Sequence, residues 1–282
     1  MPPRFQVEGG NPLSGSVRPA GNKNAALPIL AATLLADGPV TLTNVPRIRD
    51  VEAMASLLEH LGARVEWTGP NTLVADCGSV TDRPLDPGLC ARIRASILLA
   101  APLLARFGRV SLPPPGGDVI GRRRVDTHVL ALEALGARVE VGERYEIEGR
   151  RLAGTDIFLD EPSVTATENA LMAAVAARGR TVLRNAAQEP HVQDLARCLV
   201  AMGAQIEGIG SNQYVIDGGR SLRGTTFEIG PDHVEIASWI GLAAVTNGAI
   251  TIEPVRGEDL RSTLLGFDRL GVRPRLSETR LV

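Results

Sequence analysis

Four apolar runs recur along the chain at regular intervals. They cover residues 27–35, 95–105, 170–177 and 236–245, and each predicts a helix that is buried on most of its faces. A glycine follows each run and opens a β-rich stretch, as in Gly38-Pro-Val-Thr-Leu and Gly248-Ala-Ile-Thr-Ile. This order predicts a helix followed by a strand, four times over.

A second glycine motif recurs in the same four repeats, where it ends another helical pattern and starts another short strand. Its copies are Leu61-Gly62-Ala63, Leu135-Gly136-Ala137, Met202-Gly203-Ala204 and Leu270-Gly271-Val272, and their glycines are 74, 67 and 68 residues apart. A glycine just past a helix is the expected left-handed cap. The repeated order of helix and strand therefore predicts an α/β fold rather than a helical bundle or a sandwich.

The second repeat carries a longer loop than the others. From the strand glycine to the cap glycine the four repeats measure 24, 28, 24 and 23 residues, and the extra length falls in residues 113–124. Three prolines exclude a helix there, and the glycines permit hinge motion. A loop that departs from its own repeat is a candidate for function, although an ordinary surface insertion has the same appearance.

The chemistry of this loop favours the handling of anions. Arginines occupy positions 122–124, the densest cationic run of the chain, and guanidinium groups bind phosphate in a bidentate manner. A solvated surface run is the simpler interpretation of these arginines. Asp118 lies between glycine and the apolar pair Val119-Ile120, where partial desolvation would raise the pKa of its carboxyl group. Asp118 is therefore a candidate proton donor.

Lys23 is the only lysine among 30 cationic side chains. Chance survival of a surface lysine would explain it. Its context suggests more, because the polar turn Gly21-Asn22-Lys23-Asn24 opens directly onto the first apolar run. Backbone N–H groups and the dipole favour an anion at a helix N-terminus. A compact ammonium at that point can approach a crowded phosphate in a way that a planar guanidinium cannot.

Composition narrows the class of protein. The formal net charge of −2 and the sequence pI of about 6.1 argue against a general nucleic-acid binder, and 44% hydrophobic residues exclude a disordered chain. Neither of the two longest apolar stretches predicts a membrane span, and the N-terminus lacks the apolar core of a signal peptide. Three scattered cysteines suit neither a disulfide framework nor a zinc site. We expect a soluble cytoplasmic protein without a metal or a cofactor; the sequence predicts no oligomeric state.

Several motifs together carry a resemblance that runs nearly the whole chain. They are Gly21-Asn-Lys-Asn-Ala-Ala-Leu-Pro-Ile-Leu30, Asn44-Val-Pro-Arg-Ile-Arg-Asp50, Arg94-Ala-Ser-Ile97, Gly116-Gly-Asp-Val-Ile-Gly121, Arg123-Arg-Val-Asp-Thr-His128, Ser163-Val-Thr-Ala-Thr-Glu-Asn169, Asn185-Ala-Ala-Gln-Glu-Pro190 and Pro231-Asp-His-Val-Glu235. With these motifs the chain resembles the UDP-N-acetylglucosamine 1-carboxyvinyltransferases, the enolpyruvyl transferases of peptidoglycan synthesis. The Lys-Asn-Ala-Ala-Leu-Pro stretch is specific to them.

The resemblance implies an α/β fold of repeated βαβαββ-type units, three in each of two globular domains, with the active site in the cleft between them. Six units would need about 420 residues, so this chain stops about two units short. Residues 24–231 would form a complete three-unit domain that carries the active-site loop. Residues 1–23 plus 232–282 would form part of the second domain, and the family's catalytic aspartate and another phosphate-binding arginine would lie in its remainder.

The resemblance also implies a reaction and a set of site residues. The enolpyruvyl group of phosphoenolpyruvate would pass to the 3′-hydroxyl of UDP-N-acetylglucosamine through a tetrahedral phospholactoyl ketal, with release of phosphate. Asp118 and Lys23 would be catalytic, and Lys23, Asn24 and Arg123 would bind phosphoenolpyruvate. The residues that would bind the UDP-sugar are Arg94, Arg123, Arg124, Val125, Asp126, Thr127, His128, Ser163, Val164 and Thr165.

Four positions depart from the family's common pattern. Asp118 stands where a cysteine is common, although some members have aspartate and the role of proton donor can be kept. Arg124 stands where the family often has proline, Thr165 where it often has glycine, and Gln188 where it often has arginine. The last three departures concern the binding of the nucleotide rather than the phosphoenolpyruvate chemistry.

Two other functions agree with the sequence. One is an enolpyruvyl transferase of the shikimate-pathway type, whose acceptor is small and anionic; the loop with Asp118 and the segment from Arg123 to His128 favour a nucleotide sugar instead. The other is a short form that binds a UDP-sugar or a partner without turnover, because the second domain would be incomplete.

Overall fold

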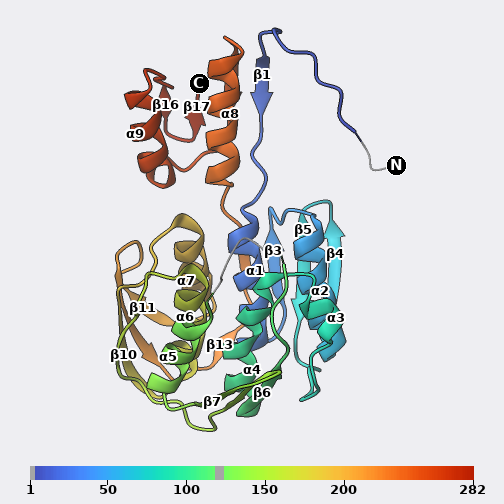
Figure 1. Ribbon diagram of the computed structural model, residues 1–282, viewed down its shortest axis with the longest axis vertical. Coiled ribbons are helices and arrows are strands. Elements are labelled where there is room, and N and C mark those ends of the chain that lie inside the picture. Colours follow the sequence, from blue (N-terminus) through green and yellow to red (C-terminus); the bar gives the residue numbers. More distant parts are fainter. Residues whose placement is uncertain (1–3, 118–123) are drawn as a thin grey trace. The chain divides into compact units, whose positions relative to one another are not determined.

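The computed structural model describes residues 4–117 and 124–282. The chain divides into two compact units. The large unit is Lys23–Ile229, and the small unit combines Met1–Asn22 with Gly230–Val282. The same repeat of helices and strands occurs in both units (Figure 1). The large unit contains three copies of it and the small unit contains one.

Each repeat of the large unit keeps a sheet of its own. The orders are β14-β3-β5-β4, β6-β8-β7 and β11-β12-β10-β9, and a two-stranded sheet pairs β13 with β2. The strands are β2 (Ala36–Asp37), β3 (Val40–Thr43), β4 (Arg64–Gly69), β5 (Thr72–Asp76), β6 (Arg109–Leu112), β7 (Arg138–Val141), β8 (Tyr145–Glu148), β9 (Asp156–Phe158), β10 (Gly179–Arg184), β11 (Gln205–Glu207), β12 (Gln213–Gly218), β13 (Leu222–Arg223) and β14 (Thr226–Glu228).

The three sheets share one pattern of pairing. In each, an antiparallel hairpin (β4–β5, β7–β8 or β11–β12) pairs its second strand with the strand that follows the apolar helix, namely β3, β6 or β10. Two of the sheets gain a parallel strand, β14 beside β3 and β9 beside β10. The same connection three times over is the structural form of the repeat that the glycine spacing predicts.

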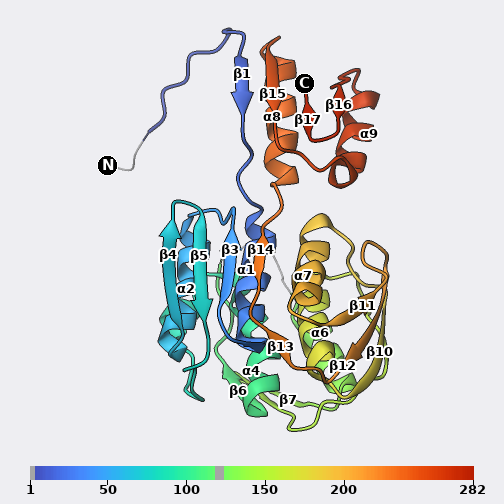
Figure 2. The same ribbon diagram turned by 180° about the vertical axis from the view of Figure 1, so that it is seen from behind.

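Helices fill the space between these sheets. They are α1 (Lys23–Ala32), η1 (Thr33–Leu35), α2 (Arg49–Leu61), α3 (Pro87–Cys90), η2 (Arg94–Leu99), α4 (Ala100–Phe107), α5 (Asp126–Ala134), α6 (Val164–Ala176) and α7 (Pro190–Ala201). Helix α1 packs on α2, α6 and α7 (Figure 2). Helix α6 also packs on α4 and α5. One continuous apolar core joins them, and α1 is buried along its length from Ala25 to Ala32, as its all-apolar sequence predicts.

The small unit contains the fourth repeat. Its sheet has the order β1-β15-β17-β16, with β1 (Ser14–Val17) parallel to β15 (Ala249–Ile252) and short strands β16 (Leu276–Ser277) and β17 (Arg280–Leu281). Helix α8 (His233–Val245), η3 (Gly257–Leu260) and α9 (Arg261–Arg269) complete it. Its core is small and consists of Ile236, Ile240, Ile252, Val255, Leu260 and Leu281.

Helix α8 corrects one expectation. The apolar run over residues 236–245 predicts burial on most faces, yet only Ile236 and Ile240 of α8 are buried, while Val245 is 82% exposed and Leu242 is 37% exposed. The reason lies in the small unit itself, where one sheet and α9 supply partners for a single face of the helix.

The cap glycines behave as predicted. Gly62, Gly136, Gly203 and Gly271 all have positive φ, between 81° and 113°, which is the left-handed region that favours glycine.

No helix among the described residues has the length and apolarity that a membrane span needs.

Candidate functional site

The large unit contains a cavity of about 710 Å³ at which the first turns of three helical elements meet. Helix α1 contributes Lys23 and Asn24, η2 contributes Arg94, and α6 contributes Val164 and Thr165. The first turn of a helix presents backbone N–H groups without intrahelical partners. The cavity is therefore suited to a ligand rich in acceptor oxygens.

Lys23 is the first residue of α1, in agreement with the prediction that it lies at a helix N-terminus. Its ammonium Nζ lies 2.8 Å from Asp50 Oδ2, a carboxylate in the first turn of α2. Both side chains are partly exposed, at 44% and 39%, so solvent weakens this ion pair. Lys23 is held at the cavity by a partner that an incoming anion can displace.

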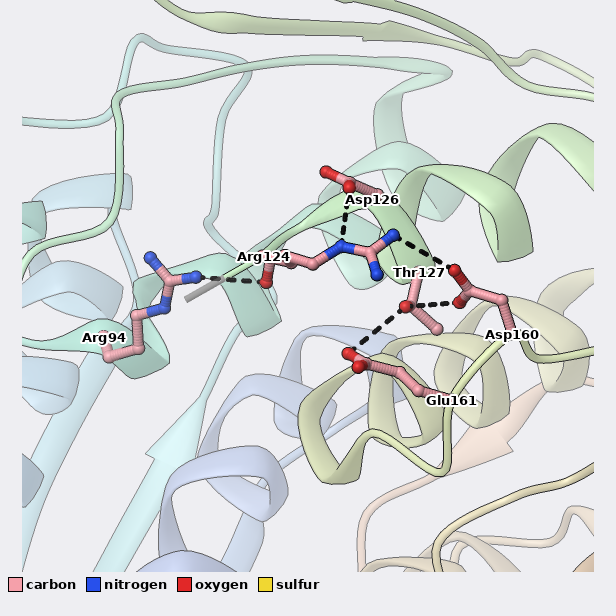
Figure 3. Close-up of polar contacts among 6 residues, drawn as sticks. All are labelled: Arg94, Arg124, Asp126, Thr127, Asp160 and Glu161. Carbon is pink, nitrogen blue, oxygen red and sulfur yellow. Dashed lines mark hydrogen bonds and ion pairs between the residues drawn. The ribbon is translucent and has the colours of Figure 1, made fainter. Parts of the chain in front are cut away.

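Arg124 lines the cavity and lies at the centre of a polar network (Figure 3). Its guanidinium donates from Nε to Asp126 Oδ2 at 2.8 Å and from Nη2 to Asp160 Oδ2 at 3.2 Å. Arg94 Nη2 donates to the backbone carbonyl of Arg124 at 3.3 Å. These contacts connect the end of the long loop to η2 and to the segment that precedes α6.

Thr127 and Asp160 complete this network. The Thr127 hydroxyl donates to Asp160 Oδ1 at 2.6 Å and lies 3.4 Å from Glu161 Oε1 (Figure 3). The hydrogen bond from Thr127, together with the nearby charge of Arg124, lowers the pKa of Asp160. Asp160 is therefore a carboxylate that neutralises Arg124 rather than a proton donor.

His128 lies behind the cavity wall in a buried chain of hydrogen bonds. Its Nε2 is 3.0 Å from Thr165 Oγ1 and its Nδ1 is 2.9 Å from Asn169 Nδ2. The ring is 4% exposed. Burial, with the positive charge of Arg94 as a second cause, lowers the pKa of His128 to about 4, so the imidazole is neutral near pH 7.

Glu168 is a buried acid in the same wall. It lies on α6 and lines the cavity, it is 1% exposed, and its Oε1 has no hydrogen-bond partner among the described residues. Burial, followed by the charge of Glu189, raises the pKa of Glu168 well above its ordinary value. Burial therefore favours the protonated form of this carboxyl group.

The cysteines have no chemical role that the described geometry supports. Cys77, Cys90 and Cys198 are all buried, and burial raises the pKa of each thiol, to about 11 for Cys90 and about 12 for Cys198. A thiol of this kind is protonated and is a poor nucleophile. Within the described residues, no group of three acidic, histidine or cysteine side chains could hold a metal ion.

The structure brings most of the predicted site residues together. Lys23, Asn24, Arg94, Arg124, Ser163, Val164 and Thr165 line the cavity. Asp126, Thr127 and His128 lie at the start of α5, directly after Val125. Each contacts a residue that lines the cavity, namely Arg124, Glu161 and Thr165 respectively. Asp118 and Arg123 lie outside the described residues. Gly117 and Arg124, which flank residues 118–123, both line the cavity.

Two glycines of the long loop have a packing role rather than the hinge role that the sequence suggests. A Cβ on Gly116 would lie 1.8 Å from the carbonyl oxygen of Ala91, and Gly117 has φ +86° with a Cβ position 3.0 Å from the backbone nitrogen of Arg94. Their N–H groups donate to the carbonyls of Cys90 and Ala91. Only glycine allows the loop to approach this closely.

Sequence reasoning missed several lining residues. They are Asp50, Arg92, Glu161, Glu168 and His191. Asp50 and Glu168 lie within motifs that carry the resemblance, yet nothing local to either residue distinguishes it from a surface acid or a helix residue. Their partners are distant in sequence, so only the packed structure identifies them.

Comparison with known proteins identifies the family of the chain. The EPSP synthase (3-phosphoshikimate 1-carboxyvinyltransferase) family matches residues 7–271 of the chain. A UDP-N-acetylglucosamine 1-carboxyvinyltransferase of Bradyrhizobium diazoefficiens is 60% identical over 281 residues, which cover 100% of this chain and 65% of that protein. A UDP-N-acetylglucosamine 1-carboxyvinyltransferase of Treponema denticola is 50% identical over 277 residues, which cover 98% of this chain and 65% of that protein. The chain thus spans about 65% of the length of these curated relatives.

Solved structures show the same fold. The enolpyruvyl transferase NikO from Streptomyces tendae has a TM-score of 0.85 at 24% identity, over 98% of this chain and 66% of that chain. An EPSP synthase from Acinetobacter baumannii has a TM-score of 0.76 at 21% identity, over 97% and 64%. At these identities the likeness concerns the fold alone, and it confirms the predicted fold class.

Proposed function

The chain belongs to the EPSP synthase (3-phosphoshikimate 1-carboxyvinyltransferase) family of enolpyruvyl transferases, and from this premise we propose that it acts as a UDP-N-acetylglucosamine 1-carboxyvinyltransferase. In this reaction the enolpyruvyl group of phosphoenolpyruvate passes to the 3′-hydroxyl of UDP-N-acetylglucosamine, and phosphate is released. The proposed role is the first committed step of peptidoglycan precursor synthesis, in the cytoplasm, and so in cell wall biogenesis, cell shape and division. The substrates are its two proposed partners.

One observation carries the proposal. Lys23 at the start of α1, Arg94 on η2, Arg124, and Ser163, Val164 and Thr165 at the start of α6 all line one cavity, although they are up to 142 residues apart in the sequence. These are residues that the resemblance assigns to the two substrates. Four cationic side chains line the cavity, with Arg92 as the fourth, and offer the ammonium and guanidinium donors that a phosphate and a diphosphate bind, although the acids Asp50 and Glu161 line it as well.

The proposed chemistry proceeds in two steps. The 3′-hydroxyl loses its proton to solvent as its oxygen forms a bond to C2 of phosphoenolpyruvate, and the C3 methylene of phosphoenolpyruvate receives a proton from Asp118, which gives the tetrahedral ketal. The bond from C2 to the phosphate oxygen then breaks, C3 returns a proton to the Asp118 carboxylate, and phosphate leaves. Lys23 would hold the phosphate through both steps, and Asp118 would deliver the proton to C3.

A phosphate-release assay tests this function. The assay uses this chain and an extended form, in which the part of the Bradyrhizobium relative that the chain does not match is joined to it. We expect the extended form to release phosphate from phosphoenolpyruvate with UDP-N-acetylglucosamine and not with 3-phosphoshikimate. Phosphate release with 3-phosphoshikimate, and none with UDP-N-acetylglucosamine, would instead establish an enolpyruvyl transferase of the shikimate-pathway type.

Two variants of the extended form sharpen the assay. Asp118→Asn should lose turnover because an amide cannot deliver the proton, whereas Asp118→Cys should retain it because a thiol can act as an acid. Binding of UDP-N-acetylglucosamine by both forms, with turnover by neither, would favour the non-catalytic alternative.

A further inference from the structure

The orientation of the Asn169 side-chain amide is fixed by the protein backbone. Its Oδ1 accepts a hydrogen bond from the backbone N–H of Ala101 at 3.2 Å, and its Nδ2 donates to the backbone carbonyl of Ile97 at 3.0 Å. A backbone N–H can only donate and a carbonyl can only accept. Reversal of the amide would place two donors together and two acceptors together, so the orientation has a single solution. Asn169 is fully buried.

This orientation determines the tautomer of His128. One hydrogen of Asn169 Nδ2 goes to Ile97, and the second points to His128 Nδ1 at 2.9 Å. Nδ1 must therefore accept, and the proton of the neutral ring must lie on Nε2. Nε2 in turn lies 3.0 Å from Thr165 Oγ1 and donates to it.

The chain of donors ends at the Thr165 hydroxyl. Because Oγ1 accepts from His128, its own proton is free to point elsewhere, and Thr165 is half-buried and lines the cavity. We propose that Asn169 is a positioning residue that fixes the Nε2–H tautomer of His128 and thereby makes the Thr165 hydroxyl a hydrogen-bond donor to an acceptor oxygen of the uridine nucleotide.

The surroundings of the hydroxyl favour such a ligand. Arg94 and Arg124 line the same cavity, and Ser163 and Val164 adjoin Thr165 at the start of α6. All of these groups offer N–H or O–H donors. The pKa of His128, lowered to about 4, keeps the ring neutral and this relay intact through the physiological range. The inference rests on the proposed function for the identity of the ligand and on the protein alone for the tautomer.

Nitrogen-15 NMR of the histidine rings tests the relay without any ligand. The chain has four histidines, and the signals of His128 are assigned by their loss in His128→Gln. We expect His128 to carry its proton on Nε2 at pH 7. In Asn169→Asp a carboxylate replaces the donor at Nδ1, so the proton should move to Nδ1. A proton on Nδ1 in the unaltered chain would overturn the inference. Should Asn169→Asp fail to fold, the spectrum of the unaltered chain decides.

Calorimetric titration with UDP tests the donor. Thr165→Val preserves the shape of the side chain and removes the hydroxyl, and we expect it to bind UDP roughly tenfold more weakly, the scale of one hydrogen bond. Thr165→Ser, which keeps the hydroxyl, should bind within about twofold of the unaltered chain. Equal affinity of Thr165→Val and the unaltered chain would overturn the donor role.

Two further titrations identify the acceptor and separate the inference from the proposed function. A loss for Thr165→Val with UDP and with uridine would assign the acceptor to the base or ribose, and a loss with UDP and inorganic diphosphate would assign it to the phosphates. If the unaltered chain binds none of the three, the donor role of Thr165 fails. Phosphate release by the extended form still decides the proposed function, and the NMR result on the tautomer stands by itself.

Discussion

At the scale of single residues, the only lysine of the chain, Lys23, is the residue that we propose to hold the phosphate of phosphoenolpyruvate. A guanidinium cannot reproduce the compact ammonium that lies 2.8 Å from Asp50 at the start of α1. We expect Lys23→Arg in the extended form to weaken phosphoenolpyruvate binding by roughly 1–3 kcal/mol, the scale of one charge-assisted hydrogen bond. Equilibrium binding measures the effect. Arg64→Lys, an exchange of the same two cations at an exposed pair with Glu66, is the control and should change nothing. Unaltered affinity in Lys23→Arg would refute the role.

His128 predicts a dependence of stability on pH. Its pKa of about 4 lies below the ordinary value of 6.5, so the unfolded chain takes up the proton first as the pH falls. The stability that the neutral ring contributes is complete above pH 6.5 and is lost as the pH falls from 6.5 to 4, by about 3 kcal/mol. Urea unfolding at pH 7 and pH 4.5 measures this loss.

His128→Gln is the control for this measurement, because Gln does not titrate. The loss of stability between pH 7 and pH 4.5 should be smaller in this variant. Glu168, whose pKa is raised, acts in the opposite direction, since the unfolded carboxyl ionises first as the pH rises. The difference between the two proteins isolates His128, and equal losses in both would contradict the assignment.

The residue scale also shows where sequence reasoning ends. The single lysine and its polar turn predict an anion-binding helix start, and α1 begins at Lys23. Nothing in the sequence indicates that Asp50 is its partner, or that Asn169 orients His128 from 41 residues away. Such contacts depend on how helices pack against one another. The pattern of apolar residues shows which face of a helix is buried, but not which residues that face meets.

At the scale of elements, the cap glycines have consequences that differ by site. Gly62 and Gly136 end helical segments with φ +103° and +98°, but a Cβ on Gly62 would lie 3.0 Å from the Ser79 carbonyl, whereas the nearest atom at Gly136 is 3.8 Å away. We expect Gly136→Ala to lower the free energy of unfolding by about 1–2 kcal/mol through backbone strain, and Gly62→Ala to lower it further through the added contact. Urea unfolding ranks the two.

Gly266 provides the matched control. It lies within α9, has no positive φ, and a Cβ there would meet nothing within 4 Å. Gly266→Ala should stabilise its unit by about 1 kcal/mol, because alanine is the better helix former. Equal losses at Gly62 and Gly136, or a loss at Gly266, would contradict this account.

Element boundaries show a second limit of the sequence. The apolar run predicts a helix over residues 170–177, whereas α6 begins at Val164, because the Ser163 hydroxyl accepts from the Ala166 N–H and caps the helix six residues earlier. This extension places Thr165, Glu168 and Asn169 on one helix. Helix α8 shows the reverse case. Its apolar sequence predicts the helix correctly, but few residues of the small unit pack against it.

At the scale of the molecule, the two units differ greatly in core size. Buried residues of the large unit form one continuous cluster through three repeats, whereas the small unit has six. Each unit contains one of the two tryptophans, Trp67 in the large and Trp239 in the small. We expect Trp239 fluorescence to change at a lower urea concentration than Trp67 fluorescence, because the small unit buries less apolar surface.

Two single-tryptophan variants separate these signals. Trp239→Phe leaves Trp67 to report on the large unit, and Trp67→Phe leaves Trp239 to report on the small unit. Circular dichroism of both variants checks that neither substitution changes the overall content of secondary structure. Coincident transitions would show that the two units unfold as one and would contradict the independence of their cores.

A crystal structure of this chain with UDP-N-acetylglucosamine tests the central claim most directly, because it locates the ligand atom by atom. The account predicts the nucleotide in the cavity of the large unit, with its phosphates beside the guanidinium groups of Arg94 and Arg124 and one of its oxygens about 3 Å from Thr165 Oγ1. An empty cavity at a saturating ligand concentration, or a nucleotide ordered at any other surface, would contradict it.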